Sequence, residues 1–137
     1  MSSVRLSDAA FPLRVIEARD AALRQIAAVQ SECQALGADL LVLAAPAAHQ
    51  GDPRRFRSFV AANPGTDVER SRTAFHADFV ERLTAAGVRV VDPMAALEAQ
   101  VASGLSSYHI EGHWNATGHA AALDVLVPAL AEVVSAR

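Results

Sequence analysis

The sequence contains no lysine, a single cysteine and few aromatic residues. Its 12 basic residues, all arginines, are outnumbered by 15 acidic ones, and the net charge of −3 excludes the basic footprint of a nucleic-acid-binding protein. The single cysteine, Cys33, excludes a disulfide within the chain, and its place in a helical pattern predicts a packed or half-packed thiol. Aromatic residues make up 5% of the chain, with one Trp and one Tyr, so a segment that contains both is unusual in this sequence.

Long apolar runs are also missing. No run approaches the roughly 20 residues of a membrane-spanning helix, and the N-terminus lacks the charged and then apolar layout of a signal peptide. We therefore expect a soluble chain without a membrane span, and its compartment stays unassigned. With 137 residues, of which 52% are hydrophobic and 20% charged, the chain has the length and composition of one globular domain, over 1–137, or of the C-terminal portion of one.

The apolar pattern predicts helices that alternate with two short strands. Helices are expected over 13–36, 67–86, 93–102 and from 116 onward, the last interrupted at Pro128. Strands are expected over 40–45 and 88–92, and the first is apolar throughout, which is typical of a strand buried on both faces of a parallel sheet. This order predicts an α/β fold with a parallel sheet flanked by helices. Because two strands make a poor sheet, we expect further weak strands near the N-terminus, or completion of the sheet by a partner chain or in a homo-oligomer.

The connection over 46–65 follows the first strand and is rich in Pro, Gly and Arg. It contains His49 and three arginines, Arg54, Arg55 and Arg57. Ligand sites of α/β folds lie at the carboxyl ends of strands, so this connection is a candidate substrate-side loop, with His49 as a candidate substrate-binding residue. A solvated surface loop is the simpler interpretation and the one we favour.

Residues 106–119 contain most of the imidazoles, the Trp and the Tyr. In an extended backbone, His109, Glu111 and His113 alternate with other residues and point to one side, which places a carboxylate beside two imidazoles. Asn115 stands where the N-cap of the following Ala-rich helix is expected. His113 would then lie on the loop that enters the helix, near a carboxylate able to fix its tautomer, as a general base requires.

The order Glu111-Gly112-His113-Trp114-Asn115, followed by Gly118-His119 and an Ala-rich helix, resembles the last conserved block of the SGNH (GDSL-type) hydrolase superfamily. It is most similar to the branch with an Asp-x-His-Trp motif, which includes the alginate O-acetylation proteins. The resemblance implies a flavodoxin-like α/β fold and an esterase or O-acyltransferase that acts on small acyl esters, such as acetyl groups on carbohydrate, without a cofactor. It also implies His113 as the catalytic base and Glu111 in the place of the family's Asp. Trp114 would form a pocket wall and is a second candidate substrate-binding residue.

The resemblance extends over 38–137, and two blocks of the family pattern are missing from the chain. These are the Gly-Asp-Ser turn after an apolar strand, which carries the nucleophile, and the Gly-x-Asn-Asp block, which supplies oxyanion-hole groups. Ser7-Asp8 reverses the family order, and Ser106 and Ser107 are too near His113 in the sequence to form a triad with it. The serine nucleophile is therefore unassigned.

Two alternatives belong to other classes of protein. His109, Glu111 and His113, with His119 as a further ligand, offer the imidazole and carboxylate donors of a Zn²⁺-type site. The chain is also compatible with a degenerate, non-catalytic SGNH-like module that binds carbohydrate or protein through its arginine-bearing loop.

Overall fold

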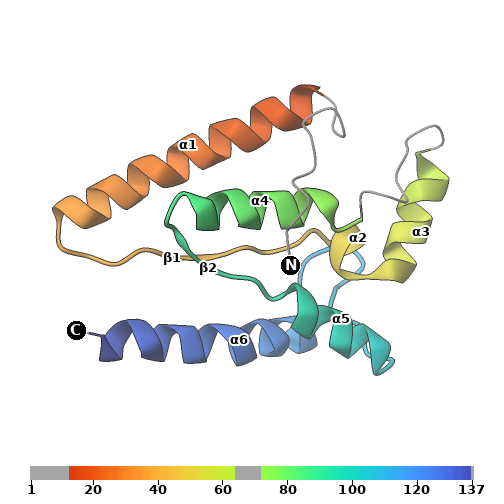
Figure 1. Ribbon diagram of the computed structural model, residues 1–137. Coiled ribbons are helices and arrows are strands. Elements are labelled where there is room, and N and C mark those ends of the chain that lie inside the picture. Colours follow the sequence, from red (N-terminus) through yellow and green to blue (C-terminus); the bar gives the residue numbers. More distant parts are fainter. Residues whose placement is uncertain (1–12, 64–71, 137) are drawn as a thin grey trace, which may run out of the picture. The chain divides into compact units, whose positions relative to one another are not determined.

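The computed structural model describes residues 13–63 and 72–136 (Figure 1). These residues form a mixed α/β structure that is mostly helical and contains a two-stranded parallel sheet. The chain divides into two compact units. The first comprises residues 1–42 and 74–90, and the second comprises residues 43–73 and 91–137.

The first unit contains the long helix α1 (Leu13–Ala35), as predicted, and helix α4 (Ala74–Ala85). Helix α4 was predicted to begin at residue 67 but begins at Ala74, because residues 72–73 form a turn; residues 67–71 lie outside the described ranges. A buried ion pair joins the two helices: Arg19 Nη1 of α1 lies 3.0 Å from Asp78 Oδ2 of α4. Arg82, one turn further along α4, donates its Nε–H to both carboxylate oxygens of Asp78 at 3.0 Å. Asp78 is thus held between two guanidinium groups, which compensates for the burial of its charge.

The sheet pairs β1 (Leu41–Leu43) with β2 (Arg89–Val91), and the pairing continues where the Ala44 N–H donates to the Val91 carbonyl at 2.9 Å. Both strands lie inside the ranges that the sequence predicted. The expectation that β1 is buried on both faces was wrong, because all three of its residues are only half-buried. No third strand occurs within residues 13–63 and 72–136, and the proposed weak strands near the N-terminus fall on residues outside these ranges.

The second unit is built from four helices and the loop that carries the His-rich segment. The helices are α2 (Ala48–Gly51), α3 (Pro53–Ala62), α5 (Met94–Ala102) and α6 (Ala116–Ser135). Helix α5 packs on α6, and α2 contacts both α3 and α5. The most deeply buried apolar side chains of this unit are Leu97, Pro93, Ala121, Ala122 and Tyr108.

Two expectations about these helices were wrong. The connection after β1 is not a long loop, because Asp52 and Pro53 start helix α3: the Asp52 carboxylate accepts from the Arg54 N–H at 2.8 Å, and proline suits the first helical position. Helix α6 is not interrupted at Pro128 but continues through it to Ser135. Pro128 is exposed, so the carbonyl of Asp124, which loses its helical donor at this proline, can be hydrated.

Helix α6 is the one described helix that is long and apolar enough to cross a membrane by length and composition alone. It has a mean hydropathy of 1.4 over its most apolar window, and 17% of that window is buried within the structure. Length and composition of this kind are weak support for a membrane span.

Candidate functional site

The His-rich segment forms a tight hairpin. Tyr108 and Trp114 pair as an isolated antiparallel bridge, and between them the His109 N–H donates to the His113 carbonyl at 2.7 Å. The Gly112 N–H closes a turn on the His109 carbonyl at 3.0 Å, with Gly112 at a φ of +92° that favours glycine. The predicted extended backbone over 109–113 was therefore wrong, and alternation does not place the two imidazoles and the carboxylate on one side.

The hairpin borders a surface depression of about 350 Å³. Its walls are Ala45 and Pro46, which follow β1, together with Gly112, His113, Trp114 and His119. The structure thus brings two of the predicted site residues, His113 and Trp114, together at the carboxyl end of a parallel strand, where α/β folds bind ligands. It also adds His119, whose ring meets the Trp114 indole edge-on with 5.7 Å between centroids.

Asn115 fixes the entry of this hairpin into α6, as predicted. Its side-chain oxygen accepts from the Gly118 N–H at 3.0 Å, which is the N-cap interaction. Its side-chain amide donates to the Ser106 carbonyl at 2.7 Å, and its backbone N–H donates to the Ser107 carbonyl at 3.1 Å. One residue therefore ties the start of the hairpin to the start of the helix.

The packing around residue 118 explains why the motif has glycine at this position. A Cβ at this position would overlap the backbone carbonyl oxygen of Ser107 and would lie 3.1 Å from the Cβ of Trp114. The first turn of α6 can approach the hairpin this closely only because residue 118 has no side chain.

The Glu111–His113 pair is not formed. Both side chains are exposed, and neither makes a hydrogen bond or an ion pair with any part of the chain that the structure describes. Glu111 does not line the depression. Among the described residues no group of three or more His, Cys, Asp and Glu side chains is arranged to hold a metal ion, so the geometry gives no support to the metal alternative at His109, Glu111 and His113.

His49 does not line the depression either. Its ring stacks on Phe59, with 4.4 Å between centroids and 11° between the planes, and so joins α2 to α3. Burial lowers the pKa of His49 below its ordinary value, because the charged imidazolium is less well solvated there. The structure thus gives His49 a packing contact with Phe59, and its contact with a substrate stays a prediction.

The two serines of the motif are engaged in the hairpin. Ser106 Oγ donates to the Tyr108 carbonyl at 3.0 Å. Ser107 is completely buried, and its hydroxyl has no hydrogen-bond partner in the described structure. Neither serine lines the depression, and Ser7 lies outside the described residues. The nucleophile therefore stays unassigned.

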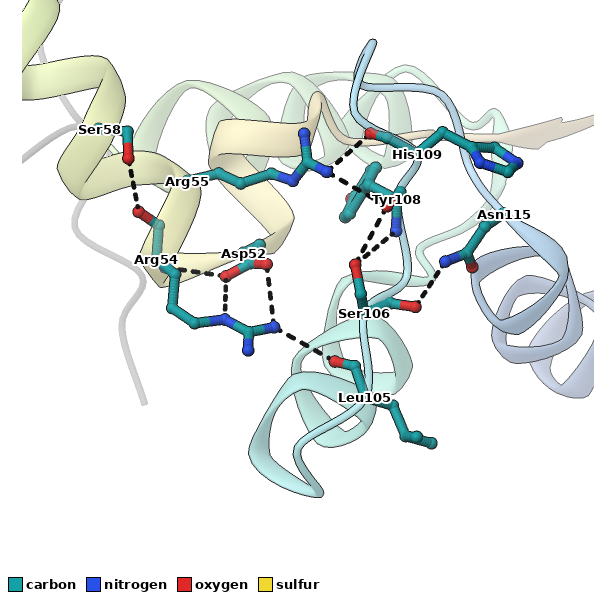
Figure 2. Close-up of polar contacts among 9 residues, drawn as sticks. All are labelled: Asp52, Arg54, Arg55, Ser58, Leu105, Ser106, Tyr108, His109 and Asn115. Carbon is teal, nitrogen blue, oxygen red and sulfur yellow. Dashed lines mark hydrogen bonds and ion pairs between the residues drawn. The ribbon is translucent and has the colours of Figure 1, made fainter.

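Two arginines near the start of α3 hold the hairpin, and sequence reasoning missed this role (Figure 2). Arg54 Nη2 donates to the Leu105 carbonyl at 3.3 Å, and Arg55 donates to carbonyls of the hairpin. Asp52 secures the base of this arrangement: burial alone would raise the pKa of Asp52, but hydrogen bonds and charge from Arg54 outweigh burial and lower it. The helix-start signal Asp52-Pro53 could have placed both arginines on the first turn of a helix.

Tyr108 is the buried anchor of the hairpin. Its side chain packs so closely over Gly51 that a Cβ there would overlap the phenol oxygen, and its hydroxyl has no hydrogen-bond partner in the described structure. Burial raises the pKa of Tyr108, and the neighbouring Trp114 and Arg55 oppose this shift without cancelling it. Tyr108 thus stays neutral and serves as an apolar contact.

Comparison of the chain with protein-family models, with curated proteins and with solved structures found no match.

Proposed function

We propose that the chain carries the general base of an SGNH-type esterase or O-acyltransferase that acts on small acyl esters, with acetyl groups on carbohydrate as the substrate class. The corresponding fold is flavodoxin-like, and the two parallel strands with their helices would be part of it. The observation that carries the proposal is the position of His113, which lines the depression beside Ala45 and Pro46 at the end of β1. An exposed imidazole with no partner in the described structure is available for proton transfer.

In this proposal, His113 takes the proton from a serine hydroxyl as the serine attacks the acyl carbon, and returns it to the alcohol that leaves. Trp114 offers a flat apolar wall to a sugar ring or an acyl chain, a use for which aromatic side chains are well suited. His119, edge-on to Trp114, is placed to donate a hydrogen bond to a substrate oxygen in the same depression.

The role of Glu111 in this scheme depends on substrate binding. Glu111 lies two residues before His113 on the same exposed turn, and it would orient the imidazole when a substrate fills the depression. The serine would come from residues outside the described ranges or from a second chain, since the Ser106 hydroxyl is hydrogen-bonded to the Tyr108 carbonyl and Ser107 is completely buried.

The test is labelling with a fluorophosphonate serine-hydrolase probe, followed by intact-mass analysis and peptide mapping. We expect a stoichiometric adduct on one serine of the wild-type chain and a labelling rate lower by about 10²–10⁴-fold in His113→Ala, the usual worth of a general base. Glu111→Gln should slow labelling less. His109→Ala is the matched control, because it removes an exposed imidazole of the same turn that does not line the depression. Equal labelling of wild type and His113→Ala would refute the role of His113.

A second candidate function is a non-catalytic module that binds carbohydrate at the same depression. The unformed Glu111–His113 pair favours it, because a base without an orienting group contributes little to catalysis. Absence of any adduct, together with glycan binding that Trp114→Ala abolishes and His113→Ala leaves intact, would select this function over the first.

A further inference from the structure

The hairpin that carries His113 has little internal structure to fix its shape. Its regular contacts are three backbone hydrogen bonds, two of which form the bridge between Tyr108 and Trp114 and one of which closes the turn at Gly112. The side chains of His109, Ile110 and Glu111 at its tip are exposed. Such a short, solvated turn would sample several conformations on its own. Its shape must therefore be fixed by contacts from elsewhere in the unit.

One guanidinium group makes three of these contacts. Arg55 Nη2 donates to the Tyr108 carbonyl at 3.2 Å and to the His109 carbonyl at 2.7 Å, and Nη1 donates to the Ile110 carbonyl at 3.4 Å. The guanidinium carbon also lies 5.7 Å from the centre of the Tyr108 ring, within cation–π range. Figure 2 shows the side chain reaching from α3 to the hairpin. Three successive carbonyls of the hairpin thus share one cationic donor.

The His109 carbonyl is the central acceptor in this arrangement. It accepts from Arg55 and also from the Gly112 N–H that closes the turn. Fixing this carbonyl fixes the orientation of the turn, and His113 follows Gly112 directly. The planar fork of arginine can reach neighbouring carbonyls simultaneously, whereas the ammonium group of lysine is a point charge on a flexible stem.

We infer that Arg55 is the positioning residue of the His113 hairpin: by binding the carbonyls of residues 108–110 it holds the imidazole in the depression. The hairpin part of this inference stands on the contacts alone, and its catalytic consequence rests on the proposed function. Sequence reasoning grouped Arg54, Arg55 and Arg57 together as surface or ligand-binding arginines. The structure separates them, because Arg57 is exposed and makes no interaction with the described residues.

The experiment compares Arg55→Lys, which keeps the charge but loses the fork, with Arg57→Lys on the same helix. In the whole chain, NMR would record amide exchange of His109 and Gly112 and the ring signals of the five histidines. We expect Arg55→Lys to speed exchange at both amides by about tenfold, the net worth of one hydrogen bond. It should also move the ring signals of His113, while the ring signals of His76 in the other unit and the fold seen by circular dichroism stay unchanged. Arg57→Lys should match wild type throughout.

Fluorophosphonate labelling of the same variants separates the two proposals. If wild type is labelled, Arg55→Lys should be labelled about 10²-fold more slowly, as expected for a displaced catalytic group. If wild type is not labelled but the hairpin signals of Arg55→Lys move, the proposed function fails and the positioning role stands. Hairpin amide exchange and His113 ring signals identical to wild type in Arg55→Lys would overturn the inference, and shifted hairpin signals with unchanged labelling would overturn its catalytic part.

Discussion

Replacement of Gly118 by alanine sets two well-known effects against each other. Gly118 is the third residue of α6, and its N–H donates to the capping oxygen of Asn115 at 3.0 Å. Alanine is the best helix former and would by itself stabilise α6 by about 1 kcal/mol relative to glycine. The added Cβ, however, would overlap the backbone carbonyl of Ser107 far inside the 3.0 Å below which Cβ contacts essentially never occur.

Steric overlap should dominate, because the obstructing atom belongs to the backbone and cannot rotate away. Overpacking of a close contact costs about 1–3 kcal/mol. Moving the Ser107 carbonyl would also strain its hydrogen bond from the Asn115 N–H, now 3.1 Å, at a further cost of about 1 kcal/mol. After subtraction of the propensity gain, Gly118→Ala should lower the free energy of unfolding by about 1–3 kcal/mol.

Urea unfolding monitored by the fluorescence of Trp114, the only Trp in the chain, measures this quantity. Ala120→Gly, at an exposed position of the same helix, is the control, since it measures helix propensity alone and should cost about 1 kcal/mol. If Gly118→Ala were as stable as wild type, or more stable, propensity would outweigh the overlap and the close approach of α6 to the hairpin would be refuted.

Two further predictions concern ionisable side chains outside the depression. Asp78→Ala should lower the free energy of unfolding in urea by about 3 kcal/mol, the lower end for a broken buried ion pair, because Arg19 keeps its contact with Asp20 at 2.8 Å. Asp20→Ala removes a partner that is 41% exposed and should lower the same free energy by less than about 1 kcal/mol. Equal losses in the two variants would contradict this ranking. Burial lowers the pKa of His49, so the imidazole binds a proton more readily in the unfolded chain than in the folded one. The stability that depends on neutral His49 is therefore complete above pH 6.5 and is lost as the pH falls through the lowered pKa. The decrease in the urea midpoint below pH 6.5 should therefore be smaller in His49→Gln, and an unchanged decrease would rule out His49 as its source.

The elements with long periodic patterns or clear boundaries could be predicted from the sequence. Helix α1 was expected over 13–36 and is observed at Leu13–Ala35, because 23 residues give the helical period room to show. The N-cap at Asn115 was also predicted, since capping depends on neighbouring residues alone. Helix α3 was missed although Asp52-Pro53 is a start signal, because the Pro, Gly and Arg content around it is typical of a loop.

The conformation of the hairpin could not be predicted from its short sequence. The alternation of polar and other residues over 109–113 is compatible with a strand and with a turn. The turn forms because Gly112 adopts a positive φ and the His109 N–H donates to the His113 carbonyl. The Arg55 contacts depend on a helix 50 residues earlier in the chain, and no local pattern reports a contact over that separation. The depression itself requires residues 45–46, the hairpin and the start of α6 to meet, which is a property of the folded second unit.

The hairpin is held from two sides, and the two sides make separable contributions. Asn115 and Gly118 seat it against α6 through backbone contacts that also start the helix, so changes there disturb folding and site together. Arg55 reaches the hairpin from α3 and donates hydrogen bonds to the carbonyls of residues 108–110, next to the exposed tip. Few other contacts depend on the conformation of this tip. A chain that kept the fold but loosened the tip would therefore retain its depression and lose the fixed position of His113. For a general base, which must lie within hydrogen-bond reach of the proton it takes, that loss alone is enough to impair function.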